Sequence, residues 1–200
     1  NKYGVKDKGI LLFAMGDGNH SLATAKACYE NLKKEIGEKA LSSKSRYALV
    51  ELVNLHSDAL EFEAINRVIF NTDKDKLLNS LKEYYTINKE GNGQEFRVVT
   101  DSIDEAWYIE NPKSNIAVGS IQMFLDDYLK DNVGKIDYIH GEDVTKSLAS
   151  KDNNVGFIFD AMAKEDLFKT VILDGALPRK TFSMGHANDK RYYLEARKIK

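Results

Sequence analysis

Residues 9–20 read Gly-Ile-Leu-Leu-Phe-Ala-Met-Gly-Asp-Gly-Asn-His, and this stretch decides the fold that the sequence predicts. Its first part, residues 9–15, is a continuous apolar run, which is typical of a strand buried on both faces of a sheet. The residues after the stretch place apolar side chains at helical spacing until the stop at Gly37, namely Leu22, Ala25, Tyr29, Leu32 and Ile36. We therefore predict a buried strand, a tight turn and a helix.

The rest of the chain alternates strand and helix patterns. Strands are predicted at 47–55, 65–70, 95–100, 106–110, 135–139 and 155–161. Helices are predicted at 73–81, 120–129, 142–149 and 164–173. Gly91-Asn92-Gly93 predicts a hairpin turn, and residues 181–199 alternate as a C-terminal antiparallel hairpin would, with its turn near 185–189. This order predicts a mixed α/β (α+β) fold with a mixed sheet and flanking helices.

The domain organisation follows from length and from local polarity. Two hundred residues suit one large domain or one and a half small ones. We assign residues 1–81 and 116–200 to the α/β core, and we expect the polar stretch 82–115 to be an insertion or a small second subdomain. Because the chain opens on Asn1 and an apolar run follows almost at once, we expect it to be the C-terminal portion of a longer protein. The missing N-terminal portion would then hold part of the active site.

Composition restricts the compartment and the partners. Apolar residues make up 42% and charged residues 30%, which is typical of a folded protein with a core. The formal net charge of -2, without a separate basic block, makes nucleic-acid binding unlikely. A single cysteine excludes an intrachain disulfide, and no apolar run reaches membrane-spanning length. We expect a cytoplasmic protein with a small-molecule ligand; its oligomeric state has no signature in the sequence.

The turn at 16–21 is the sharpest functional signal. Gly16 and Gly18 let the backbone turn tightly, and the unpaired N–H groups at a helix start attract an anion such as a nucleotide phosphate. In this interpretation Asp17 holds a magnesium ion or orients His20, and His20 bonds a phosphate oxygen or acts as a base. In the alternative interpretation Asp17 and Asn19 are ordinary turn residues and His20 is a partly exposed cap residue.

Two more histidines follow predicted strands and have acidic neighbours. His56 is close to Asp58, and His140 is close to Glu142. If the strands are parallel neighbours, these residues converge with His20 beyond the carboxyl ends of the strands. Such a group could bind a transition metal. Scattered surface histidines are the simpler alternative, since the spacings match no local metal motif.

Cations elsewhere in the sequence are candidates for charge neutralisation. Lys180 and Thr181 stand just before a predicted strand, where they could close over a phosphate. The alternative is a solvated strand entry. Arg67 lies in an otherwise apolar segment, so it is either a snorkelling side chain or an inward-facing anion ligand.

Three blocks of sequence together resemble one bacterial family. The block Phe-Ala-Met-Gly-Asp-Gly-Asn-His-Ser-Leu-Ala-Thr-Ala at 13–25 resembles the Asp-Gly-His-His-Arg signature of the domain of unknown function 1015 family. The block Val-Asn-Leu-His-Ser-Asp at 53–58, followed by Asn66-Arg67, resembles the second block of the family. Leu-Pro-Arg-Lys-Thr-Phe at 177–182 resembles its closing Pro-Lys-Ser/Thr block. The family protein is longer at its N-terminus.

That family is similar to the archaeal free-serine kinase and to the ParB/sulfiredoxin-like fold. The resemblance implies a ParB/sulfiredoxin-like core, with ATP or ADP and magnesium as cofactors. It also implies that residues 17–20 (Asp17, Gly18, Asn19 and His20) line the phosphate site. The chain departs from the signature at two positions, because Asn19 stands for its first histidine and Ser21 for its arginine.

Three functions are compatible with these residues. The first is a nucleotide-dependent phosphotransferase acting on a small hydroxylated metabolite such as a free amino acid, with Lys180 and Arg67 neutralising charge. The second is a non-catalytic nucleotide- or metabolite-binding regulator, which the loss of the signature arginine at Ser21 favours. The third is a metal-dependent hydrolase that uses His20, His56 and His140.

Overall fold

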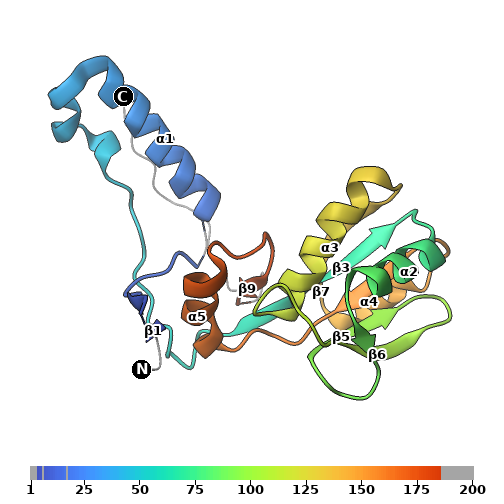
Figure 1. Ribbon diagram of the computed structural model, residues 1–200. Coiled ribbons are helices and arrows are strands. Elements are labelled where there is room, and N and C mark those ends of the chain that lie inside the picture. Colours follow the sequence, from blue (N-terminus) through green and yellow to red (C-terminus); the bar gives the residue numbers. More distant parts are fainter. Residues whose placement is uncertain (1–3, 6, 17, 186–200) are drawn as a thin grey trace. The chain divides into compact units, whose positions relative to one another are not determined.

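The computed structural model describes residues 4–5, 7–16 and 18–185, with side chains from residue 7 onward (Figure 1). Contacts divide the chain into two compact units. Unit 1 comprises Asn1–Leu11 and Glu61–Ser183, and unit 2 comprises Leu12–Leu60 and Met184–Lys200. Unit 2 contains helix α1 and two short 3-10 helices, with the bounds α1 (Asn19–Ile36), η1 (Gly37–Ser42) and η2 (Lys44–Arg46).

A seven-stranded sheet forms the centre of unit 1, in the order β4-β6-β5-β8-β3-β7, with β9 also paired to β3. Its strands are β3 (Phe62–Phe70), β4 (Ile87–Asn88), β5 (Gln94–Val99), β6 (Asp104–Ile109), β7 (Lys135–His140), β8 (Val155–Ile158) and β9 (Phe182–Met184). The described registers are antiparallel, and they place Arg67 of β3 opposite both Tyr138 of β7 and Phe157 of β8. Strands β1 (Gly4–Val5) and β2 (Gly9–Ile10) form a separate antiparallel pair.

Helices cover both faces of this sheet (Figure 1). Helices α2 (Lys74–Tyr84) and α3 (Ala117–Asp131) bury their apolar sides on one face, and α4 (Glu142–Ala149) packs on the other. Helix α5 (Lys164–Asp174) contacts β1. The main core lies under α2 and α3, and its largest fully buried apolar side chains include Ile69, Leu77, Leu81, Phe96, Ile121, Leu125 and Phe157. The predicted α/β class, a sheet with flanking helices, is confirmed. The described strand registers are antiparallel, whereas a mixed sheet was predicted.

Local chemistry explains where α2 begins. The Asp73 carboxylate accepts a hydrogen bond of 3.0 Å from the amide of Lys76, which satisfies one of the amides left open at a helix start. Leu77, Leu78 and Leu81 then recur at helical spacing and are buried. The predicted helix after Asp73 is thus confirmed.

The hairpin between β5 and β6 differs from the prediction. The two strands pair directly, and their turn runs from Thr100 to Ile103, where the amide of Thr100 donates to the carbonyl of Ile103 over 2.8 Å. The predicted turn at 91–93 instead separates β4 from β5, and β4 pairs with β6. Gly93 is required there because a Cβ atom would lie 2.1 Å from the carbonyl oxygen of Ile109.

The prediction of buried strands at 9–15 and 47–55 is wrong. Only Gly9–Ile10 is a strand, and Leu12 and Leu49 are 76% and 93% exposed. An apolar run becomes a strand only where a neighbouring strand takes its backbone hydrogen bonds, and apart from the β1–β2 pair no described strand pairs with these two segments. Helix α1 and its stop at Gly37 are confirmed, yet none of the described side chains of α1 is buried.

Two further predictions concern regions that the sequence singled out. Residues 82–115, where we expected an insertion or a subdomain, supply β4, β5 and β6 to the seven-stranded sheet. Of the predicted C-terminal hairpin at 181–199, β9 is described and pairs with β3, whereas its turn and second strand lie outside the described residues.

Over the part of the chain that the structure describes, no helix combines the length and the apolar character needed to cross a membrane.

We predict that Gly156→Ala destabilises unit 1 by overpacking. A Cβ at Gly156 in β8 would lie 2.7 Å from the Cβ of Ala149 in α4, so strand and helix would have to separate, at a cost of about 1–3 kcal/mol. The double variant with Ala149→Gly should be destabilised by less than the two single changes together, as measured by urea unfolding. If the changes in unfolding free energy of the two single variants simply add in the double variant, the side chains at 149 and 156 do not clash as proposed.

Candidate functional site

The start of α1 has the geometry of an anion site. Gly18 occupies the N-cap position in the left-handed conformation, with φ at 77°, and it has no side chain with which to cap the helix. The first turn of α1 contains no acidic residue. The first helix amides and the helix dipole therefore offer positive potential at this turn. Asn19, His20 and Ser21 in this turn are exposed, as is Gly18. Asp17 lies outside the described residues.

A groove of about 470 Å³ lies beside this turn within unit 2. One wall is a single face of α1, because Asn19, Leu22, Lys26 and Tyr29 recur at helical spacing. The other wall comes from residues 45–48, and the full lining is Met15, Asn19, Leu22, Ala23, Ala25, Lys26, Tyr29, Ser45, Arg46, Tyr47 and Ala48. The volume is in the range of small-molecule sites.

The charges along the groove are of one sign. Lys26 and Arg46 line it, and none of the described lining residues has a carboxylate. The guanidinium of Arg46 lies over the ring of Tyr47 at 5.7 Å from the centroid and donates to the carbonyl of Leu41 over 3.1 Å. These contacts fix the cation at the edge of an apolar wall. The sequence analysis missed both cations; Lys26 could have been found, since it follows Leu22 by four positions on the same helix face.

The other predicted residues of unit 2 lie apart from the groove lining. His20 and Ser21 belong to the first turn of α1 but do not line the groove. His56 and Asp58 are exposed in the segment before β3, where the amide of His56 donates to the Asn54 side chain over 3.0 Å. His56 therefore belongs to a local turn and does not follow a strand, contrary to the prediction.

The predicted histidine cluster lacks its structural premise. His20 and His56 belong to unit 2 and His140 to unit 1, and the described strands are antiparallel neighbours. Among the residues that the structure describes, no three His, Cys, Asp or Glu side chains come together as a metal-binding group.

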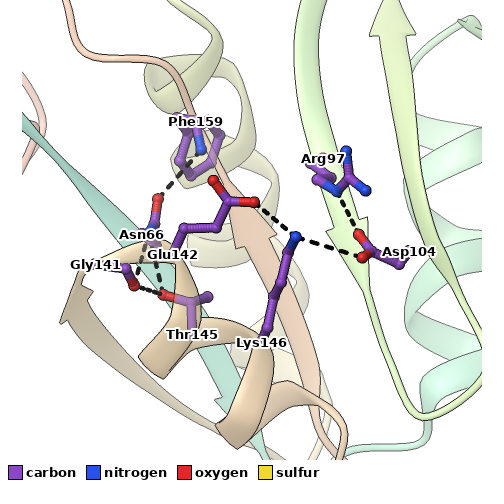
Figure 2. Close-up of polar contacts among 8 residues, drawn as sticks. All are labelled: Asn66, Arg97, Asp104, Gly141, Glu142, Thr145, Lys146 and Phe159. Atoms are coloured by element: carbon purple, nitrogen blue, oxygen red, sulfur yellow. Dashed lines mark hydrogen bonds and ion pairs between the residues drawn. The ribbon is translucent and has the colours of Figure 1, made fainter.

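His140 and Glu142 flank the turn from β7 into α4, and each has its own partner. The Nδ1 of His140 is 3.9 Å from the Oε2 of Glu63. Figure 2 shows the partner of Glu142, whose Oε1 is 2.7 Å from the Nζ of Lys146. Lys146 also lies 3.5 Å from Asp104, which pairs with Arg97. These contacts join α4 to the β5–β6 hairpin through alternating charges.

The pKa directions follow from these pairs. The hydrogen bond to Glu142 raises the pKa of Lys146, and the hydrogen bond from Arg97 lowers the pKa of Asp104. All four charges are near solvent, which screens them, so this network adds little to stability.

A buried polar network beneath this turn was missed by the sequence analysis. Asn66 of β3 is 3% exposed, and its side-chain oxygen accepts a hydrogen bond of 3.2 Å from the amide of Phe159 (Figure 2). Its Nδ2 donates to Thr145 over 3.1 Å and to the carbonyl of Gly141 over 3.4 Å. Asn66 thus ties β3 to the start of α4 and to the end of β8. The sequence did offer a signal for this network, because Asn66 is a polar residue within an apolar strand pattern.

Arg67 points to the opposite face of β3 and is fully buried. The snorkelling alternative is therefore wrong. Its Nε donates to Oε1 of Gln122 over 3.2 Å, its Nη1 donates to the carbonyl of Ile65, and its Nη2 donates to the carbonyl of Arg179 over 3.1 Å. Burial lowers the pKa of Arg67 to about 10. The side chain remains a cation at neutral pH.

The contact with Arg179 brings Arg67 next to the predicted cation segment. There the hydroxyl of Thr181 donates to the carbonyl of Pro178 over 2.7 Å, which closes a tight turn. Lys180 inside this turn has a φ of 56°, a left-handed conformation that lysine rarely adopts. Arg67, Lys180 and Thr181, which the sequence grouped as anion ligands, are thus neighbours of one turn in unit 1.

Comparison with known proteins places the chain in a family. Residues 7–128, more than half of the chain, match the model of a family described as protein of unknown function (DUF1015). The chain belongs to this family. The DUF1015 match covers α1, Arg67 and most of α3, and it ends before the turn at 178–181. No curated protein and no solved structure matched the chain significantly.

We predict that Asn66→Ala destabilises unit 1 by about 1–3 kcal/mol, because the amide of the buried Phe159 would lose its acceptor. Chemical denaturation of both proteins measures this difference. Asn92→Ala on the exposed 91–93 turn is the matched control and should leave stability within about 0.5 kcal/mol of the starting protein. Equal effects of the two changes would contradict the structural role of Asn66.

Proposed function

We propose that this DUF1015 protein is a nucleotide-dependent phosphotransferase that binds nucleotide phosphates at the start of α1. The observation that supports this most is the groove, whose charged lining residues, Lys26 and Arg46, are both cations and which adjoins an uncapped helix start. The resemblance to the archaeal free-serine kinase and to the ParB/sulfiredoxin-like fold points in the same direction.

The arrangement suits the two parts of a nucleotide. The first amides of α1, at residues 19–21, and the cations Lys26 and Arg46 would take the phosphates, which are the charged part. Leu22, Tyr29 and Tyr47 provide apolar and aromatic surface for the base.

Phosphoryl transfer needs positioning and charge neutralisation more than covalent chemistry from the protein. Lys26 and Arg46 would neutralise charge on the transferred group. If magnesium accompanies ATP or ADP, Asp17 is the residue proposed to hold it, and the ion would supply positive charge at the phosphates. His20, exposed in the first turn of α1, is the proposed base for the hydroxyl of a small acceptor such as a free amino acid.

Non-catalytic nucleotide binding is the second candidate. Ser21 is exposed at the first turn, where the family signature has an arginine, and a hydroxyl cannot replace a guanidinium in stabilising a transition state. The same groove would then serve a regulatory ligand.

We predict that ADP binds with a dissociation constant that rises about tenfold, or 1.4 kcal/mol, on Lys26→Met or Arg46→Met, because each change removes a cation from the groove. Isothermal titration with and without magnesium measures the effect. Lys34→Met on the same helix is the matched control, since Lys34 does not line the groove. An equal loss in the control would show that only the general charge of α1 matters.

Turnover separates the two candidates. Formation of ADP from ATP, or of AMP from ADP, in the presence of serine is expected of the phosphotransferase and should be lost on His20→Ala. If ADP binds tightly while no phosphorylated product forms with any hydroxylated amino acid, the protein is a binder.

A further inference from the structure

Two arginines share one aromatic ring in unit 1, away from the groove. Arg67 and Tyr138 are directly opposite each other on the paired strands β3 and β7. The guanidinium carbon of Arg67 lies 5.2 Å from the centroid of the Tyr138 ring, and that of Arg179 lies 5.9 Å from the same centroid. The two cations are thus held at one place by the sheet and by the 178–181 turn.

The charges at this place do not balance among the described residues. Among the described acids, Asp126 of α3 contacts the group. Its Oδ1 lies 3.3 Å from the Nη2 of Arg179 and accepts a hydrogen bond of 2.9 Å from the Nε2 of Gln122. Arg67 reaches no described carboxylate directly, because its three donors go to an amide oxygen and to two carbonyls. Two guanidinium groups therefore face a single carboxylate. A buried charge without a counter-charge is costly.

Hydrogen-bond donors at this place are left over as well. A guanidinium has five N–H groups, and among the described residues those of Arg67 reach three acceptors. The hydroxyl of Tyr138 is buried and has no hydrogen-bond partner in the described part of the chain. Buried polar groups are almost always satisfied in folded proteins, so these donors indicate a missing acceptor.

We infer that Arg67, Tyr138 and Arg179 form a subsite for a small oxyanion, a carboxylate or a phosphate group. One such group would supply both the missing negative charge and the missing acceptor oxygens. The oxygens of a planar carboxylate or of a tetrahedral phosphate match the forked donors of arginine. This subsite lies wholly within unit 1 and is independent of the nucleotide proposed for the groove of unit 2.

Asp126 acts as the internal substitute for this anion. The side chains of Asp126 and Arg179 are about half exposed, at 51% and 59%, and their ion pair is long at 3.3 Å. Exposed pairs of this kind are weak. An incoming oxyanion can therefore compete with the Asp126 carboxylate for Arg179.

The experiment is isothermal titration of the full chain with inorganic phosphate, and separately with acetate, at constant ionic strength. It is carried out on a Lys26→Met/Arg46→Met background, so that the two cations of the groove do not contribute. Asp126→Asn removes the competing charge and should tighten binding about tenfold. Asp127→Asn is the matched control: it removes the same charge one position along α3, where the carboxylate binds Lys130 and Tyr84, and should have little effect.

Tyr138→Phe is the second variant and keeps the test decisive even where Asp126→Asn fails to fold. Loss of the hydroxyl should weaken binding about tenfold while leaving the melting temperature of the free protein unchanged or higher, since an unsatisfied buried group is removed. The stronger of the two anions identifies the group, phosphate or carboxylate.

Several outcomes overturn the subsite. One is the absence of binding of either anion on the groove-variant background; a second is equal binding in Asp126→Asn and Asp127→Asn. A third is a Tyr138→Phe variant whose free form melts lower with anion affinity unchanged, which would mean that the cluster only supports the fold. ADP binding by the chain with an intact groove is measured separately, so failure of the subsite and failure of the proposed nucleotide site are distinguishable.

Discussion

The pairing of β3 with its neighbours is the interaction on which unit 1 depends. This strand lies between β7 and β8 and also pairs with β9, so it joins segments from residue 62 to residue 184. Because successive side chains of a strand point to opposite faces, Asn66 reaches α4 and Arg67 reaches α3. Two adjacent polar residues thereby organise both layers of helices. A shift of one residue in the register of β3 would exchange the two faces and bury each group among the wrong partners.

These two buried residues differ in how completely the protein satisfies them. Asn66 has hydrogen-bond partners for its oxygen and its amide nitrogen within unit 1, so its network holds β3, α4 and the end of β8 together. Arg67 reaches neutral oxygens, and the nearby Tyr138 hydroxyl has no described partner. Asn66 therefore contributes to stability. The under-satisfied groups around Arg67 place the candidate ligand site on the α3 face of the same strand.

Unit 2 attracts negative charge by different means. Its positive potential comes from the start of α1 and from Lys26 and Arg46, both of which are exposed. Its helix buries no described side chain, so the unit offers surface and charge without a deep core. The chemistry proposed for a nucleotide fits such a surface, because phosphates need fixed donors and a base needs an apolar wall.

The sequence by itself determined most elements of unit 1, because periodic burial leaves a clear pattern: α2 after Asp73, α3, α4, α5 and the strands β3, β7 and β8 all lie where the pattern predicts them. It also determined the helix and stop of α1 and the DUF1015 family. Tertiary structure decided which apolar runs are strands, since residues 9–15 and 47–55 look like strands but have no described partner for most of their length. It alone brought Arg67 to Arg179, 112 residues away, and gave Asn66 its partners. Such contacts depend on strand pairing over long separations, for which local sequence has no periodic signal.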